Sequence, residues 1–136
     1  MKLLMIFADK FEYNPTIKTI ETAATITEGK SYEKCLTAFI HAEAEDEEDL
    51  NKVEKKMVKN IKWACTKNGT KKVVLHSFAH LSESKASPEF TKELFDKAEE
   101  RLKNADYEVS QTPFGYFLDL NMNAPGFSLA RIFKSI

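Results

Sequence analysis

Residues 71–82, KKVVLHSFAHLS, place a short apolar run directly before a polar loop. Val73, Val74 and Leu75 are apolar, and two of them are β-branched, so the run predicts a buried strand. In the sheets of α/β proteins, ligand sites gather at the carboxyl ends of the strands. The loop at 76–82 is therefore the first candidate for a functional site.

Two predicted helices flank this strand, because apolar residues recur there at helical spacing. The first begins in the acidic run at 43–49, which suits the positive end of a helix dipole, and ends near Asn68-Gly69. Its buried face consists of Leu50, Val53, Met57, Ile61 and Ala64. The second has Ser87 as its cap and Pro88 at its first position, and it ends near Asn104. Its buried face consists of Phe90, Leu94, Ala98 and Leu102.

The rest of the chain is expected to form strands, apart from one last helix. Strands are predicted in the apolar segments 2–7, 34–44, 107–110 and 116–123. The segment 25–34 suggests a strand or a loop around Gly29, Asn14-Pro15 a loop, and 128–136 a helix. This order predicts an α/β fold, a mixed β-sheet with packed helices. We expect a single domain at 1–136, which could also be the first domain of a longer protein.

The composition is that of an ordinary soluble globular protein, with 43% hydrophobic and 30% charged residues among 136. The formal net charge of −1 argues against a general nucleic-acid coat, which needs many Lys and Arg residues, but allows a local basic patch. Cys35 and Cys65 lie in apolar segments and are expected to be buried free thiols. No apolar stretch reaches the roughly 18 residues of a membrane span, and 1–11 is interpreted as a strand rather than a signal peptide. We therefore expect a cytoplasmic protein.

His76 and His80 are the titratable residues of the first candidate site. Their spacing of four could hold a metal on a helix, but they lie at a strand end and no third ligand is evident, so we expect neither a metal nor another cofactor. His80 could instead line a polar site together with backbone groups. The alternative is a loop histidine whose hydrogen bonds are satisfied locally.

The segment TPFGYF, residues 112–117, is the second candidate. Gly115 suggests a position where a side chain would obstruct a turn or a ligand. The turn could simply be a corner before a core strand. It could also form one wall of a site together with the loop at 76–82.

The third candidate is a row of lysines on the first predicted helix. Lys55, Lys59 and Lys62 fall at helical spacing and could contact the phosphates of a nucleic acid. The alternative is a solvated face whose charges are balanced by nearby acids. No glycine-rich phosphate loop, GxSxG motif or Cys-His nucleophile is present.

Five segments in this order resemble the N-terminal editing domain of archaeal-type threonyl-tRNA synthetases: KLLMIFADKFEY, CLTAFIHAEAEDE, FAHLS, PFGYF and LARIFKSI. The resemblance spans nearly the whole chain, and FAHLS followed some thirty residues later by PFGYF is its most specific part. It implies the D-aminoacyl-tRNA deacylase-like fold, a homodimer, and hydrolysis of serine wrongly attached to threonine tRNA. Such domains act alone or fused to a synthetase. They are needed because serine and threonine differ by one methyl group, which binding discriminates by only about 1–3 kcal/mol.

The resemblance also implies roles for individual residues. The pocket for the terminal adenosine and the aminoacyl group would be formed by Phe78, Ala79, Pro113, Phe114, Gly115, Tyr116 and Phe117. His80 would contact the substrate, and water would attack the ester with help from the 2′-hydroxyl of the RNA.

This chain differs from the family pattern at three places. The family usually has Tyr-Lys at Phe117-Leu118, His-Pro at Phe127-Ser128, and Glu at Arg131. One hypothesis is a hydrolase in which Arg131 replaces the missing cation. A second is a catalytically degenerate relative that serves as a tRNA-binding or dimerisation module. A third is a dimeric α/β domain that acts on an unrelated small ligand.

Overall fold

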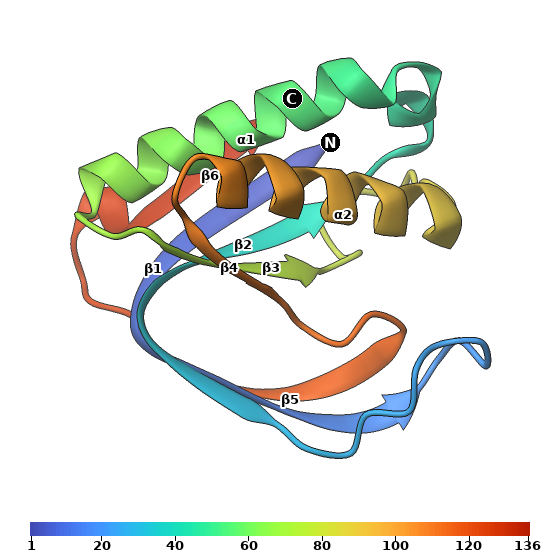
Figure 1. The fold of residues 1–136 in the computed structure, drawn as a ribbon, viewed down its shortest axis with the longest axis horizontal. Coiled ribbons are helices and arrows are strands. Elements are labelled where there is room, and N and C mark those ends of the chain that lie inside the picture. Colours follow the sequence, from blue (N-terminus) through green and yellow to red (C-terminus); the bar gives the residue numbers. More distant parts are fainter.

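The computed structural model describes residues 1–136 as one mixed sheet with two helices packed on it (Figure 1). The strands are β1 (Lys2–Lys18), β2 (Lys30–His41), β3 (Lys72–Ser77), β4 (Glu108–Gln111), β5 (Tyr116–Asn123) and β6 (Arg131–Ser135). The helices are α1 (Leu50–Lys67) and α2 (Pro88–Asn104), with short 3-10 turns η1 (Ala44–Glu48) and η2 (Ser128–Ala130). The predicted α/β class is therefore confirmed.

The order of strands across the sheet is β4-β3-β2-β1-β5, and β6 pairs with β1 beside β5. β2, β3 and β4 are parallel, whereas β1 runs antiparallel to β2, β5 and β6. The carboxyl ends of the three parallel strands therefore meet at one edge of the sheet. This is the edge at which the sequence predicted a site.

Each face of the sheet carries its own apolar cluster. The larger cluster lies under α1 and α2 and includes Leu3, Met5 and Ile40 from the sheet, all buried. The smaller cluster contains Phe11 and Phe39 and lies on the opposite face, where half-buried apolar side chains pack against it. Because neighbouring residues of a strand alternate between faces, β1 contributes to both clusters.

The helices follow the sequence closely, with one correction at the start of the first. Asp49 caps α1 by accepting a hydrogen bond from the Lys52 N–H, and Ser87 caps α2 in the same way. The acidic run at 43–49 is not the first turn of α1 but a separate 3-10 turn, η1. The non-helical backbone of Asp49, with φ −152° and ψ 85°, separates η1 from α1, and within η1 the Asp46 carboxylate binds the amino group of Met1.

β1 is longer than predicted, and the loop expected at Asn14-Pro15 was wrong. β1 pairs with β2 as far as Tyr13, beyond which only β5 is its partner. A proline lacks an N–H group and is tolerated where a strand has one free side or a bulge. Pro15 lies at such a position, next to a register irregularity between Pro15 and Ile17.

The final helix predicted at 128–136 was also wrong. Residues 131–135 form β6, which pairs antiparallel with the first half of β1, with Met5 opposite Ile132. Ile132 is buried under the helices, whereas Phe133 is 53% exposed on the other face. Neighbouring side chains of 131–135 thus alternate between the two faces of the sheet, as in a strand, although their apolar residues also fit a helical spacing.

Cys35 and Cys65 are buried free cysteines, as predicted. No helix has the length and apolarity that crossing a membrane requires. No group of three or more His, Cys, Asp or Glu side chains is placed to hold a metal ion.

Candidate functional site

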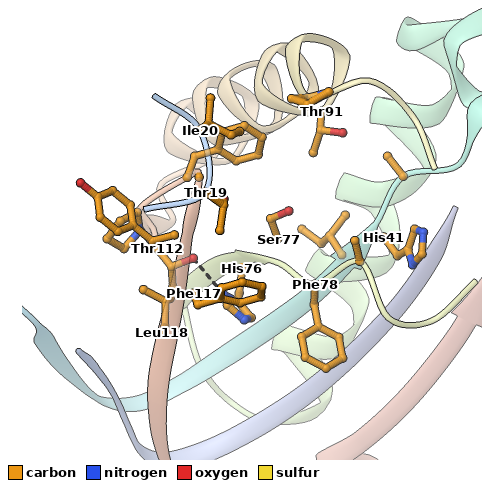
Figure 2. A pocket seen from close by; sticks show the side chains of 18 of the residues that line it. Thr19, Ile20, His41, His76, Ser77, Phe78, Thr91, Thr112, Phe117 and Leu118 are labelled. Carbon is orange, nitrogen blue, oxygen red and sulfur yellow. Dashed lines mark hydrogen bonds between the residues drawn. The ribbon is translucent and has the colours of Figure 1, made fainter. Parts of the chain in front are cut away.

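A cavity of about 450 Å³ lies at the carboxyl edge of the parallel strands (Figure 2). Its walls come from the end of β2, the loop after β3, the amino end of α2 and the turn between β4 and β5. It brings together the residues predicted to bind substrate: Phe78, Ala79, His80, Pro113, Phe114, Gly115, Tyr116 and Phe117. The two candidate loops of the sequence thus face a common cavity, and the individual roles of these residues stay predictions.

The cavity wall is largely apolar and contains no carboxylate. Half of the 22 lining residues are hydrophobic, and the polar ones are mostly hydroxyl groups and histidines. The only Lys or Arg among them is Lys85, and no Asp or Glu is present. Such a wall suits a ligand with a flat apolar part and a negative charge.

His76 lies at the floor of the cavity and is 6% exposed. Its Nδ1 and the Thr112 hydroxyl form a 2.9 Å hydrogen bond, and its ring packs edge-on against Phe39 at 5.1 Å between centroids. Burial, with a smaller effect of the nearby His80, lowers the pKa of His76 to about 4. The ring is therefore neutral at neutral pH and acts as a fixed polar part of the aromatic wall.

His80 is an exposed residue at the cavity mouth. Its ring packs edge-on against Phe78 with 4.8 Å between ring centroids, and its backbone N–H donates to the Phe78 carbonyl. No other side chain forms a hydrogen bond with the imidazole, so the ring is free to contact a ligand.

The turn at 113–115 lines the cavity and is held in place by packing and hydrogen bonds to the segment after β1. Gly115 has a φ of 85°, and a Cβ there would lie 3.0 Å from the Cβ of Ala23 and 3.2 Å from that of Ile20. The Gly115 carbonyl accepts a 2.7 Å hydrogen bond from the Thr19 N–H. The Tyr116 hydroxyl donates to the Ala24 carbonyl, which ties the turn to the segment after β1.

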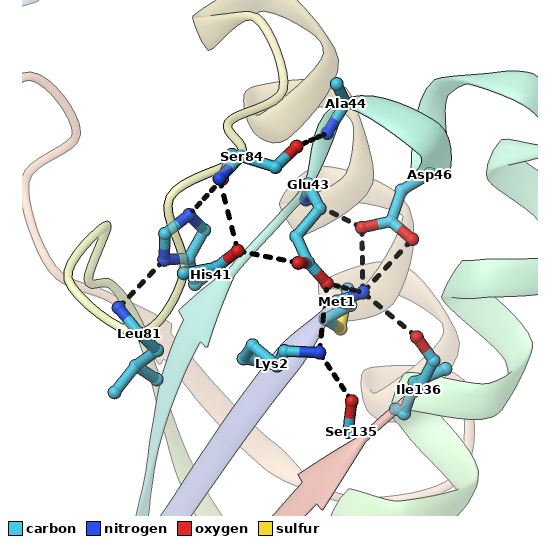
Figure 3. Close-up of polar contacts among 11 residues, drawn as sticks. Met1, Lys2, His41, Glu43, Ala44, Asp46, Leu81, Ser84, Ser135 and Ile136 are labelled. Carbon is cyan, nitrogen blue, oxygen red and sulfur yellow. Dashed lines mark hydrogen bonds and ion pairs between the residues drawn. The ribbon is translucent and has the colours of Figure 1, made fainter.

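His41 is a site residue that the sequence reasoning missed, and it holds the loop after β3 (Figure 3). Its Nδ1 accepts a 2.9 Å hydrogen bond from the Leu81 N–H, and its Nε2 donates to the Ser84 carbonyl at 2.7 Å. An amide N–H can only donate and a carbonyl can only accept, so these partners require a neutral ring protonated at Nε2. The available signal was a histidine near the end of the strand predicted at 34–44.

A second anchor of the same loop passes through Glu43 to the amino terminus (Figure 3). Glu43 accepts a 2.7 Å hydrogen bond from the Ser82 hydroxyl and forms a 2.7 Å ion pair with the buried amino group of Met1. The hydrogen bonds from the Met1 amine and from Ser82 lower the pKa of Glu43 to about 2. The ion pair therefore connects the loop to the start of β1.

Arg131, predicted as a compensating cation, does not line the cavity. It lies in β6 opposite Ile6, and its guanidinium donates to the Pro125 carbonyl at 3.0 Å. The prediction assumed that 128–136 was a helix, and the pairing of β6 with the first half of β1 places Arg131 elsewhere. The structure thus gives its catalytic role no support.

Phe117 and Leu118 do line the cavity and offer only apolar surface. Phe117 is 57% exposed, so it is a broad apolar surface at the mouth. No charge of β5 enters the cavity at the position where the resembled family has lysine.

The lysines predicted to bind RNA lie on α1, outside the cavity lining. Lys55 and Lys59 are exposed and Lys62 is half-buried, and none of them forms an ion pair. The only acid within α1 is Glu54, which is buried against Arg101. The solvent face of α1 is therefore basic, and its contact with RNA stays a prediction.

The sheet order and the cavity at its carboxyl edge define a domain of the D-aminoacyl-tRNA deacylase-like fold. Its fold is similar to that of the solved c-Myc DNA Unwinding Element Binding Protein, with a TM-score of 0.70 over 100% of this chain and 99% of that one, at 12% identity. More specifically, the family model of the archaea-specific editing domain of threonyl-tRNA synthetase matches residues 1–136. The chain belongs to this family.

Relatives of known identity agree with this assignment. The chain is 35% identical to the threonine–tRNA ligase of Methanococcus aeolicus, 34% to that of Methanococcus maripaludis and 30% to that of Thermococcus kodakarensis. Each match covers 100% of this chain but 22% of the relative. The chain thus spans about a fifth of the length of these ligases, and its family places it in tRNA editing.

Proposed function

We propose that this domain hydrolyses serine from mischarged threonine tRNA, either within a synthetase or in trans. The observation that carries the proposal is the shared cavity of the loops at 78–80 and 113–117 at the carboxyl edge of the sheet. An adenine ring would fit between the apolar parts of these loops, and the aminoacyl ester would reach the polar floor near His76 and Thr112.

The cavity wall also constrains the chemistry of the reaction. It contains no cysteine and no carboxylate, so neither a thiolate nor an acidic side chain is available as nucleophile or base. Attack by water on the ester carbonyl, assisted by the 2′-hydroxyl of the terminal ribose, is compatible with this wall. His80 would contact the substrate, and the chain would contribute mainly by positioning the ester.

A deacylation assay tests this proposal directly. Seryl-tRNA and threonyl-tRNA, both on threonine tRNA, are incubated with the wild type and with His80→Ala. We expect faster hydrolysis of the seryl ester by the wild type, and a slower rate for the variant. Release of serine at the spontaneous rate, even at high protein concentration, would refute the enzymatic function.

The second candidate function is a degenerate module that binds tRNA without turnover. It is favoured by the uncharged Phe117 and Leu118 at the mouth and by the basic face of α1. Combined Lys55→Ala, Lys59→Ala and Lys62→Ala substitutions should then weaken tRNA binding and flatten its salt dependence. Lys97→Ala with Lys103→Ala on α2 is a control. Equal affinity of the triple variant and the wild type would exclude the α1 face as the RNA contact.

We further propose that the domain forms a homodimer through the sheet face opposite the helices. Leu4 and Ile6 are half-buried there, and Phe133, which pairs with Leu4, is 53% exposed. Phe133→Asp should convert the dimer to a monomer in light scattering, whereas Trp63→Gln on α1 should not. A monomeric wild type would contradict this proposal.

A further inference from the structure

The cavity contains a single cationic side chain, that of Lys85, and its position on the loop is fixed from both sides. The residue before it, Ser84, accepts a hydrogen bond from His41 on its carbonyl and one from the Ala44 N–H on its hydroxyl. The residue after it, Ala86, donates its N–H to the Ala42 carbonyl at 3.0 Å. The backbone of Lys85 is thereby held against the extension of β2, while its exposed side chain lines the mouth of the cavity.

The charge of Lys85 has no partner within the protein. Its ammonium forms no ion pair and no hydrogen bond, and no carboxylate lines the cavity. Of the acids in the surrounding segments, Glu43 binds Met1 and Glu47 accepts from the Ser87 N–H. Glu83, two residues before Lys85 on the same loop, is exposed, lies outside the cavity lining and forms no ion pair with Lys85. Glu89 lines the neighbouring cavity instead. An unpaired ammonium in an acid-free apolar wall is a binding position for an anion.

The amino end of α2 adds to the same positive potential. Pro88 and Thr91, in the first turn of this 17-residue helix, also line the cavity. The positive end of the helix dipole therefore borders the cavity that Lys85 also lines, while Glu89 of the same turn lines the neighbouring cavity. The lining of the cavity thus combines one ammonium group with the amino end of a helix and contains no carboxylate.

We propose that Lys85 binds the phosphate on the 5′ side of the terminal nucleotide of the tRNA. This inference rests on the proposed function for the identity of the nucleotide. A phosphate suits Lys85 because a flexible ammonium recognises it as a point charge and needs no fixed geometry. In this arrangement the base packs against the aromatic wall and the ester lies at the floor. Lys85 at the mouth binds the negatively charged phosphate of the RNA backbone.

The test compares the binding of adenosine and adenosine 5′-monophosphate to the wild type, Lys85→Met and Lys85→Arg. We expect the monophosphate to bind the wild type more tightly than adenosine. Lys85→Met should lose roughly tenfold in affinity for the monophosphate and none for adenosine, as expected for one charged hydrogen bond. Lys85→Arg should retain most of the affinity. Lys97→Met on α2 should match the wild type.

Equal affinity of the wild type for the two probes, or no binding of either, would overturn the assignment. So would a Lys85→Met variant that prefers the monophosphate as strongly as the wild type. This readout is separate from the deacylation assay, because failure of hydrolysis would leave the preference for the monophosphate intact. For an active enzyme, Lys85→Met should raise KM for seryl-tRNA and leave kcat unchanged, since the phosphate does not react.

Discussion

Replacing His41 by phenylalanine should release the loop at 81–84 while leaving the rest of the fold intact. The ring would keep its shape at the end of β2 but lose both hydrogen bonds, one from the Leu81 N–H and one to the Ser84 carbonyl. Each bond contributes about 0.5–1.5 kcal/mol net, so local opening of the loop should become easier by about 1–3 kcal/mol. Since 1.4 kcal/mol corresponds to a tenfold change, the loop amides should exchange roughly 5- to 150-fold faster.

Hydrogen exchange of individual amides measures this effect. The Leu81 amide should lose protection in His41→Phe, whereas amides in α1 and β3 should exchange as in the wild type. His80→Phe is the matched control, because its ring forms no hydrogen bond in the structure and its removal leaves the anchors of the loop in place. Unchanged protection of Leu81 in a folded His41→Phe variant would refute the anchoring role.

Three further predictions follow from single contacts. Gly115→Ala should lower the free energy of unfolding by about 1–2 kcal/mol because of the positive φ, and further because of the side chains packed against the turn. In urea unfolding, its loss of stability should exceed that of Gly69→Ala, where φ is also positive but the space is open. Equal losses for the two variants would contradict the close packing of the turn. The pKa of Glu43 is lowered from 4.5 to about 2, so its contribution to the stability of the fold is complete above pH 4.5 and is lost as the pH falls towards 2. The difference in urea midpoint between the wild type and Glu43→Gln should therefore shrink over that range. A constant difference would argue against the ion pair with Met1. Arg101→Ala should lower the urea midpoint because it leaves the buried carboxylate of Glu54 unpaired. Adding Glu54→Leu should restore much of the lost midpoint. If the midpoint is not restored, Arg101 stabilises the fold by packing rather than by pairing the charge of Glu54.

Local signals in the sequence were sufficient for the helices and for the central strands. Pro88 after Ser87, and apolar residues at helical spacing from Leu50 to Ala64, act within a few residues of each other. The segments predicted wrongly owe their structure to strands far along the chain with which they pair. In 128–136 the apolar residues also fit a helix, but pairing with the first half of β1 makes 131–135 a strand.

The same distinction applies to the site. The loops at 78–80 and 113–117 could be named because their motifs are contiguous in sequence. His41 and Lys85 could not, since the role of each depends on a partner or a cavity that only the sheet order creates. Arg131 was placed by analogy on a helix predicted at 128–136, where the structure has the strand β6 instead.

The length of β1 has a consequence for how the chain folds. Among the strands of this domain, β1 is synthesised before all others and its partners β5 and β6 after all others. Lys2 and Ser135, which pair, are 133 positions apart. At a synthesis rate of about 5–20 residues per second, one edge of β1 stays unpaired for several seconds. Contacts between such distant segments also make folding slow, because a long loop must close before they form. A chain that stalls after α2 would therefore expose a long, partly apolar strand edge, which favours aggregation.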